Sequence, residues 1–65
     1  RSTCISINTG TVSELSQLNG VGPKTAESII LFRESHGMFQ SLESIMQVKG
    51  IGIKKFEKMV DQMCL

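Results

Sequence analysis

The sequence has no tryptophan, no tyrosine and only one proline among its 65 residues, and it has no long hydrophobic run. A membrane-spanning helix needs about 20 consecutive apolar residues, and no stretch approaches that length. No signal-peptide pattern opens the chain. Because Arg1 is not an initiator methionine, we expect the chain to be a fragment whose flanking segments, including any anchor or export signal, lie outside it.

Arrangements of catalytic residues are missing as well. The sequence shows no cysteine–histidine pair at a catalytic spacing, no cluster of carboxylates and no motif that places a Ser/His/Asp set. A domain of this length also leaves little room for a closed substrate pocket. The chain is therefore predicted not to be an enzyme, and we expect no catalytic residues, no small-molecule substrate and no cofactor.

The two cysteines, Cys4 and Cys64, stand at opposite ends of the sequence. Without a nearby histidine or further cysteine they do not make a zinc site, so no metal is expected. If the two ends meet in an oxidising compartment, the thiols can pair in a disulfide, and otherwise they stay free. The sequence leaves these two alternatives open.

Charge is scarce overall but unevenly distributed. The formal net charge is +1, yet four lysines and one glutamate give +3 between residues 49 and 58, and the remainder sums to −2. A local basic patch on a near-neutral domain suits weak contact with phosphates. The alternative is a solvated helix face without a ligand.

A glycine-rich stretch occurs twice, thirty residues apart. The two copies are Gly20-Val21-Gly22-Pro23-Lys24 and Gly50-Ile51-Gly52-Ile53-Lys54. The first glycine of each fits the left-handed end of a helix, and the second leaves the start of the next helix open to a ligand. A helix N-terminus with a lysine beside it suits an anion, whereas the alternative interpretation is a tight connection alone.

Each copy extends into the pattern apolar-x-x-apolar-x-Gly-apolar-Gly-x-x-x-apolar-x-x-apolar-apolar, which resembles the helix-hairpin-helix motif. The tandem arrangement resembles the DNA-binding domain of the ComEA family of competence proteins. Ile7-Asn8-Thr9 resembles the opening segment of that family, and Arg33-Glu34-x-x-Gly37-x-Phe39 resembles its link between the repeats. The similarity runs from about residue 5 to residue 61.

The resemblance implies an all-α fold: a compact four-helix domain of two helix-hairpin-helix repeats with pseudo-two-fold symmetry and an extended N-terminal segment. We expect one domain over residues 1–65, with repeat one at about 11–35, a linker at about 36–41 and repeat two at about 42–63. Helices are predicted at about 12–18, 23–35, 42–48 and 53–63. Residues 1–10 are expected to lie on the helices rather than in a sheet, because no partner strand is evident.

Local chemistry adds detail to this prediction. Thr11-Val12-Ser13-Glu14 fits a capping box at the first helix. Val21 and Ile51 are predicted to fill the space between the helices of each hairpin, and Phe39 and the methionines of the last helix are predicted to be core. Phe56 stands where the first repeat has Ala26, so we expect a looser or splayed second hairpin.

The resemblance also implies a function: sequence-independent binding of double-stranded DNA through backbone phosphates across the minor groove. The residues that match the contact positions are Asn19, Gly20, Val21, Gly22, Lys24, Thr25, Lys49, Gly50, Ile51, Gly52, Lys54 and Lys55. It further implies DNA uptake during natural transformation, an extracytoplasmic location (periplasm or outer face of the cytoplasmic membrane) and other uptake-machinery proteins as partners. No aromatic side chain is expected to be free to stack on bases, so single strands should bind less well.

Two other functions remain open. The same double hairpin resembles the extrinsic photosystem subunit, which binds proteins, so the chain could be a structural or protein-interaction module. It could also be a cytoplasmic DNA repair or replication accessory domain, although paired cysteines would count against that location. Lys24, Lys54 and Lys55 beside the glycines favour DNA over a protein partner.

Overall fold

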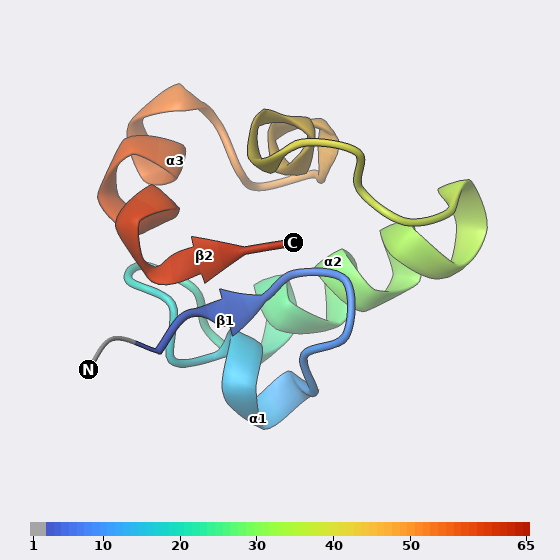
Figure 1. Cartoon of the computed structure of the whole chain (residues 1–65), viewed down its shortest axis with the longest axis horizontal. Coiled ribbons are helices and arrows are strands. Elements are labelled where there is room, and N and C mark those ends of the chain that lie inside the picture. The colour runs from blue at the N-terminus through green and yellow to red at the C-terminus, as the bar shows by residue number, and fades with distance from the viewer. Residues whose placement is uncertain (1–2) are drawn as a thin grey trace.

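The chain forms two helical hairpins, and a short pair of strands joins its two ends (Figure 1). The computed structural model describes residues 3–65. Its elements in chain order are β1 (Ile5–Ser6), α1 (Val12–Leu15), α2 (Pro23–His36), the 3-10 helix η1 (Leu42–Gln47), α3 (Ile53–Met59), the 3-10 helix η2 (Val60–Gln62) and β2 (Met63–Cys64). The all-α prediction is confirmed in its main feature, because helices form both repeats and the sheet is small.

Three of the four helices end earlier than the sequence predicted, whereas α2 matches its predicted range of about 23–35 to within one residue. α1 ends at Leu15, and the following turn is closed by N–H groups of Gln17 and Leu18 that donate to carbonyls three residues back, at 3.1 Å each. η1 is a 3-10 helix throughout, and α3 tightens into η2 after Met59. Bonds of this kind satisfy carbonyls at a helix end, so short helices pass directly into the turns. α2 is the longest at 14 residues, and within residues 3–65 no helix is long and apolar enough to cross a membrane.

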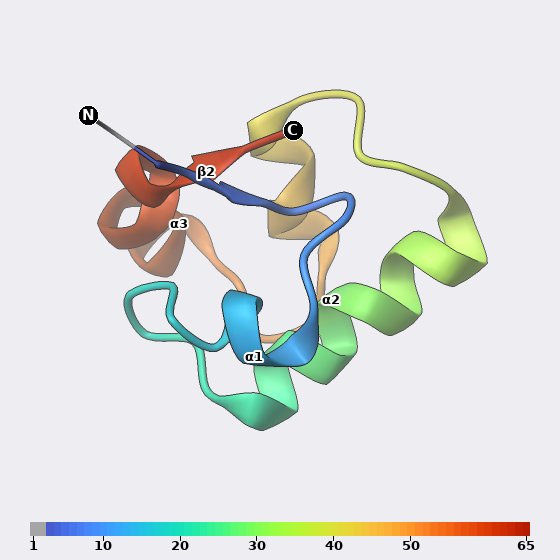
Figure 2. The same ribbon diagram turned by 60° about the horizontal axis from the view of Figure 1, so that its bottom comes forward.

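The N-terminal segment forms a sheet, so the prediction that it only lies on the helices was wrong. β1 pairs in parallel with β2, with Ile5 opposite Met63 and Ser6 opposite Cys64. The expected last helix stops early because residues 63–64 turn out of it to make this pairing (Figure 2). The Cys4–Cys64 disulfide joins the same two segments across a Cα–Cα distance of 5.6 Å. The two ends of the chain therefore meet, and of the two alternatives for the cysteines the structure has the disulfide.

A single core runs through both repeats. Its buried members come from α1, α2, η1, α3, β2 and the connections between elements: Ile7, Leu15, Leu18, Val21, Ala26, Ile29, Phe39, Ile45, Val48, Ile51, Phe56, Met59 and Met63. The predictions for Val21, Ile51 and Phe39 are confirmed, and Met63 is core although it belongs to a strand. Phe56 is also buried, so its ring fills the core of the second repeat.

Polar side chains fix the N-terminal segment to the helices. The Arg33 guanidinium donates to the carbonyl oxygens of Ile7 and Gly10 at 3.0 and 2.7 Å. The predicted capping box is present, since the Glu14 N–H donates to Thr11 Oγ1 at 3.2 Å and the Thr11 N–H to Glu14 Oε1 at 2.9 Å. The Arg33 bonds thus tie α2 to the segment that leads into α1, and the capping box fixes the start of α1 itself.

Candidate nucleic-acid interface

The two glycine turns have nearly the same backbone. Gly20 has a φ of +82° and Gly50 of +96°, a region in which a Cβ is strained. The following residues, Val21 and Ile51, each donate their N–H at 3.0 Å to the carbonyl three residues back. Although Phe56 is larger than Ala26 at the matching position, the second turn therefore keeps the same backbone conformation and hydrogen bond as the first. This match is the pseudo-symmetry that the repeated sequence predicted.

The second glycine of each turn is not required by the fold. Gly22 and Gly52 precede α2 and α3 with extended backbones, at φ −99° and −96°. A Cβ built on either would meet no atom within 4 Å. Serine, aspartate or asparagine would cap these helices better, because a side-chain oxygen would accept a free N–H. Both helices thus begin without a side-chain cap, and their starts stay open.

The first backbone amides of each helix have no intrahelical partner. In α2 the first intrahelical hydrogen bond runs from the Ala26 N–H to the Gly22 carbonyl, at 2.9 Å. In α3 the equivalent bond runs from the Phe56 N–H to the Gly52 carbonyl, also at 2.9 Å. Earlier N–H groups in each helix have no intrahelical acceptor. Together with the positive end of the helix dipole they form a place for an anion.

Lysines surround the two openings. Lys24, Lys49 and Lys54 are exposed, and Lys55 is half-buried. The Lys55 stem lies across the first turn: a Cβ on Gly20 would be 3.6 Å from Lys55 Cγ and 3.8 Å from its Cε. Thr25, which holds the same position in the first repeat, is half-buried. Charge is therefore available beside both turns.

The residues that flank the turns differ in their contacts. The Asn19 N–H donates to Gln62 Oε1 at 2.6 Å, and its Nδ2 donates to the Lys58 carbonyl at 3.5 Å. The donors of Asn19 are thus directed at the last helix of the chain. Gln62 was not identified from the sequence, and no motif there indicates it, because its partner is 43 residues away.

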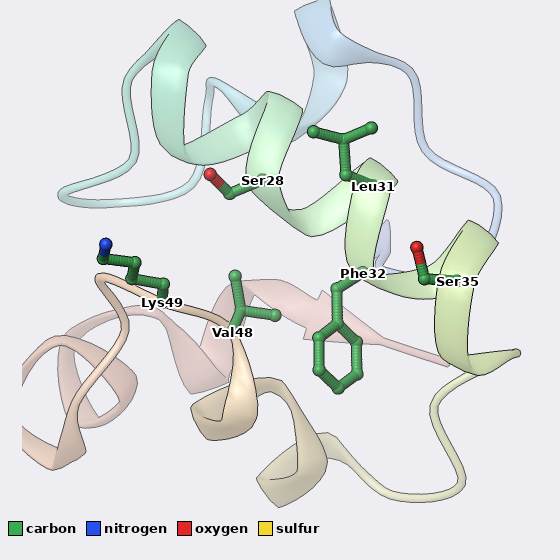
Figure 3. Close-up of a pocket in the computed structure, with 6 residues that line it drawn as sticks. All are labelled: Ser28, Leu31, Phe32, Ser35, Val48 and Lys49. Atoms are coloured by element: carbon green, nitrogen blue, oxygen red, sulfur yellow. The ribbon is translucent and has the colours of Figure 1, made fainter.

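Lys49, at the matching position of the second turn, lies at the rim of an open cleft (Figure 3). The cleft has a volume of about 270 Å³ and is lined by Ser28, Leu31, Phe32, Ser35, Val48 and Lys49. Figure 3 shows the Phe32 ring and Val48 as part of its lining, between α2 and the second hairpin. The second turn is consequently open on the side where the first turn is held by Lys58 and Gln62.

Comparison with known proteins gives the same pattern over almost the whole chain. A family described as "Helix-hairpin-helix motif" matches residues 1–64. "ComE operon protein 1" of Bacillus subtilis is 54% identical over 54 residues, which are 83% of this chain and 26% of that protein. An uncharacterized protein of Haemophilus influenzae is 44% identical over 59 residues, 89% of this chain and 53% of that protein.

A more distant match is human "Endonuclease/exonuclease/phosphatase family domain-containing protein 1", which is 38% identical over 61 residues. These residues are 94% of this chain and 11% of the human protein. The chain thus spans about half the Haemophilus relative and about a quarter of the Bacillus one.

Proposed function

This chain belongs to the helix-hairpin-helix family, of the ComEA type, and we propose that it binds double-stranded DNA through backbone phosphates without reading the base sequence. The observation that carries the proposal is the pair of glycines at the helix starts. Gly22 and Gly52 have ordinary φ values and empty space where a side chain would lie, yet both give up a favourable helix cap. A ligand that must approach the backbone closely accounts for both.

The chemistry of the openings favours phosphate. Each presents backbone N–H groups and a lysine ammonium, which are donors only, so they match an oxygen anion. Readout of a base edge would need a pattern of donors and acceptors, which donors alone do not supply. Two such openings thirty residues apart in sequence suit two phosphates of one duplex, and such contacts are indifferent to sequence.

The proposed setting is DNA uptake outside the cytoplasm. The chain is similar to "ComE operon protein 1", and its two cysteines form a disulfide, which is typical of oxidising compartments and rare in the cytosol. A protein that retains incoming DNA of any sequence needs weak contacts to the backbone, as proposed here. The disulfide argues against the alternative of a cytoplasmic repair domain.

The test is a fluorescence anisotropy titration of labelled duplexes of unrelated sequence at several salt concentrations. One phosphate at each hairpin should give a slope of log K against log salt of about −1.8, because each neutralised phosphate contributes about −0.9. We expect the same affinity for all duplexes and weaker binding of the matching single strands. Failure to bind any duplex at low salt would refute the proposal and favour a protein partner.

A further inference from the structure

The last helix of the second repeat lies against the turn of the first. The Lys55 stem runs across Gly20, with Cγ, Cε and Cδ at 3.6, 3.8 and 3.9 Å from a Cβ built there. One turn and two turns further along, the Lys58 carbonyl and the Gln62 side chain accept hydrogen bonds from Asn19. Three contacts in a row thus bind α3 and η2 to the first glycine turn.

The reverse contact does not form, although the repeats are alike in sequence. Thirty residues earlier, Thr25, Ser28 and Phe32 stand in place of Lys55, Lys58 and Gln62. Threonine is too short to cover the second turn, and a Cβ on Gly50 would meet no atom within 4 Å. Phe32 cannot accept a hydrogen bond through its ring as Gln62 does, and the cleft of Figure 3 lies there instead.

We propose that Lys55, although it begins the helix of the second hairpin, completes the phosphate site of the first. Its ammonium is one bond beyond Cε, which would lie 3.8 Å from a Cβ on Gly20, so it can reach a phosphate bound at the first turn and add to the charge of Lys24. Gln62 is a positioning residue that keeps α3 and η2 against this turn through Asn19. The second hairpin uses its own Lys54. This inference rests on the proposed function and assigns a lysine of one repeat to the phosphate site of the other.

The test uses two variants that close one opening each. Gly22→Asp and Gly52→Asp put a carboxylate at the first or the second helix start, where space and backbone both permit it. Lys55→Met is then made in the wild type and in each of these, because methionine keeps an apolar stem over Gly20 and removes only the charge. Lys54→Met is the matched control. Affinity for one labelled duplex is measured against salt in every background, and circular dichroism checks the fold.

We expect Lys55→Met to make the salt slope shallower in the wild type and in the Gly52→Asp background, where the first hairpin is intact, by less than the roughly 0.9 of a whole phosphate because Lys24 remains there. In the Gly22→Asp background it should have no effect. Lys54→Met should make the salt slope shallower in the wild type and in the Gly22→Asp background, and should have no effect in the Gly52→Asp background. If Lys55→Met loses its effect in Gly52→Asp and keeps it in Gly22→Asp, Lys55 serves the second hairpin and the inference is wrong.

A second measurement separates the two hairpins directly. Inorganic phosphate is titrated into isotope-labelled domain, and the amide signals of the two turns are followed by nuclear magnetic resonance. Lys55→Met should reduce the shifts of Gly20 and Gly22 and leave those of Gly50 and Gly52 unchanged, and an unchanged response at Gly20 would overturn the inference. A wild type that binds neither duplex nor phosphate would overturn the proposed function and this inference together.

Discussion

Asn8 pairs with the backbone of Phe39 through two hydrogen bonds, in the manner of a strand. Its Nδ2 donates to the Phe39 carbonyl at 3.1 Å, and the Phe39 N–H donates to its Oδ1 at 2.7 Å. Phe39 itself is buried and stacks on Phe32 at a centroid distance of 5.4 Å. One side chain thus joins the N-terminal segment to the link between the repeats, 31 residues away.

Asn8→Ala should destabilise the domain by about 2 to 4 kcal/mol, because it leaves a backbone donor and a backbone acceptor without partners. The melting temperature should fall by roughly 10 °C or more, since about 1 kcal/mol shifts a domain of this size by 4–8 °C. Asn8→Asp keeps the acceptor for the Phe39 N–H and loses the donor, so it should lie between wild type and Asn8→Ala. Thermal unfolding followed by circular dichroism measures all three, and equal melting temperatures would contradict the role given to Asn8.

The glycine turns could be predicted from sequence because each is encoded locally. A positive φ at Gly20 and Gly50, a buried residue after it and a helix start after that occupy five consecutive positions. There is also a physical reason why Asn8, Arg33 and Phe39 occur in the segments that match the family pattern. Asn8 and Arg33 donate to backbone carbonyls across the chain, so their identity is tied to the fold.

The rest was not predictable, because it depends on contacts between distant segments. Residues 63–64 continue the apolar spacing of the last helix, and only the facing β1 turns them into a strand. The Gln62 contact to Asn19 and the Lys55 contact to Gly20 each join one repeat to the other. Such contacts break the symmetry of the repeat, and comparison of the two copies in sequence cannot reveal them.

Reduction of the Cys4–Cys64 disulfide should lower the free energy of unfolding by about 4 kcal/mol, because the bridge closes nearly the whole chain in a loop of 60 residues. Urea unfolding with and without a reductant measures this difference. The variant Cys4→Ser with Cys64→Ser should match the reduced wild type and should not respond to the reductant. A wild type whose urea midpoint is the same in both conditions would show that the bridge does not contribute in solution.

The two glycines of the second turn should respond differently to alanine, with a clear loss of stability at Gly50 and little change at Gly52. Gly50→Ala must place a Cβ on a residue with a φ of +96°, which should cost about 1 to 2 kcal/mol. Gly52→Ala has an allowed φ of −96°, so it restricts the unfolded chain without backbone strain, but alanine is a poorer N-cap than glycine, and the two effects of up to about 1 kcal/mol each should nearly cancel. A Cβ would meet no atom within 4 Å at either position, so steric clashes do not contribute to the difference in stability between the two variants. Chemical denaturation of the two variants measures it, and equal effects would mean that the turn adopts another backbone in solution.

Gly22→Asp and Gly52→Asp should each raise stability and lower DNA affinity. The aspartate carboxylate can accept an N–H of the first helical turn and favours the positive end of the helix dipole, which together should stabilise by about 0.5 to 1 kcal/mol. The same carboxylate occupies the amides and repels a phosphate, so the duplex affinity should fall at least about tenfold, equivalent to about 1.4 kcal/mol.

Asparagine separates the two causes of that loss. Gly22→Asn offers the same cap without the charge, so it should be stabilising as well and should weaken binding less than Gly22→Asp. Melting temperature and duplex anisotropy are measured on the same samples, because the argument needs both to change in opposite directions. If Gly22→Asp and Gly52→Asp bind DNA like the wild type, the open helix starts are not the phosphate sites. If both variants are less stable than the wild type, glycine at these positions has a structural reason, and the main support for the proposed function is lost.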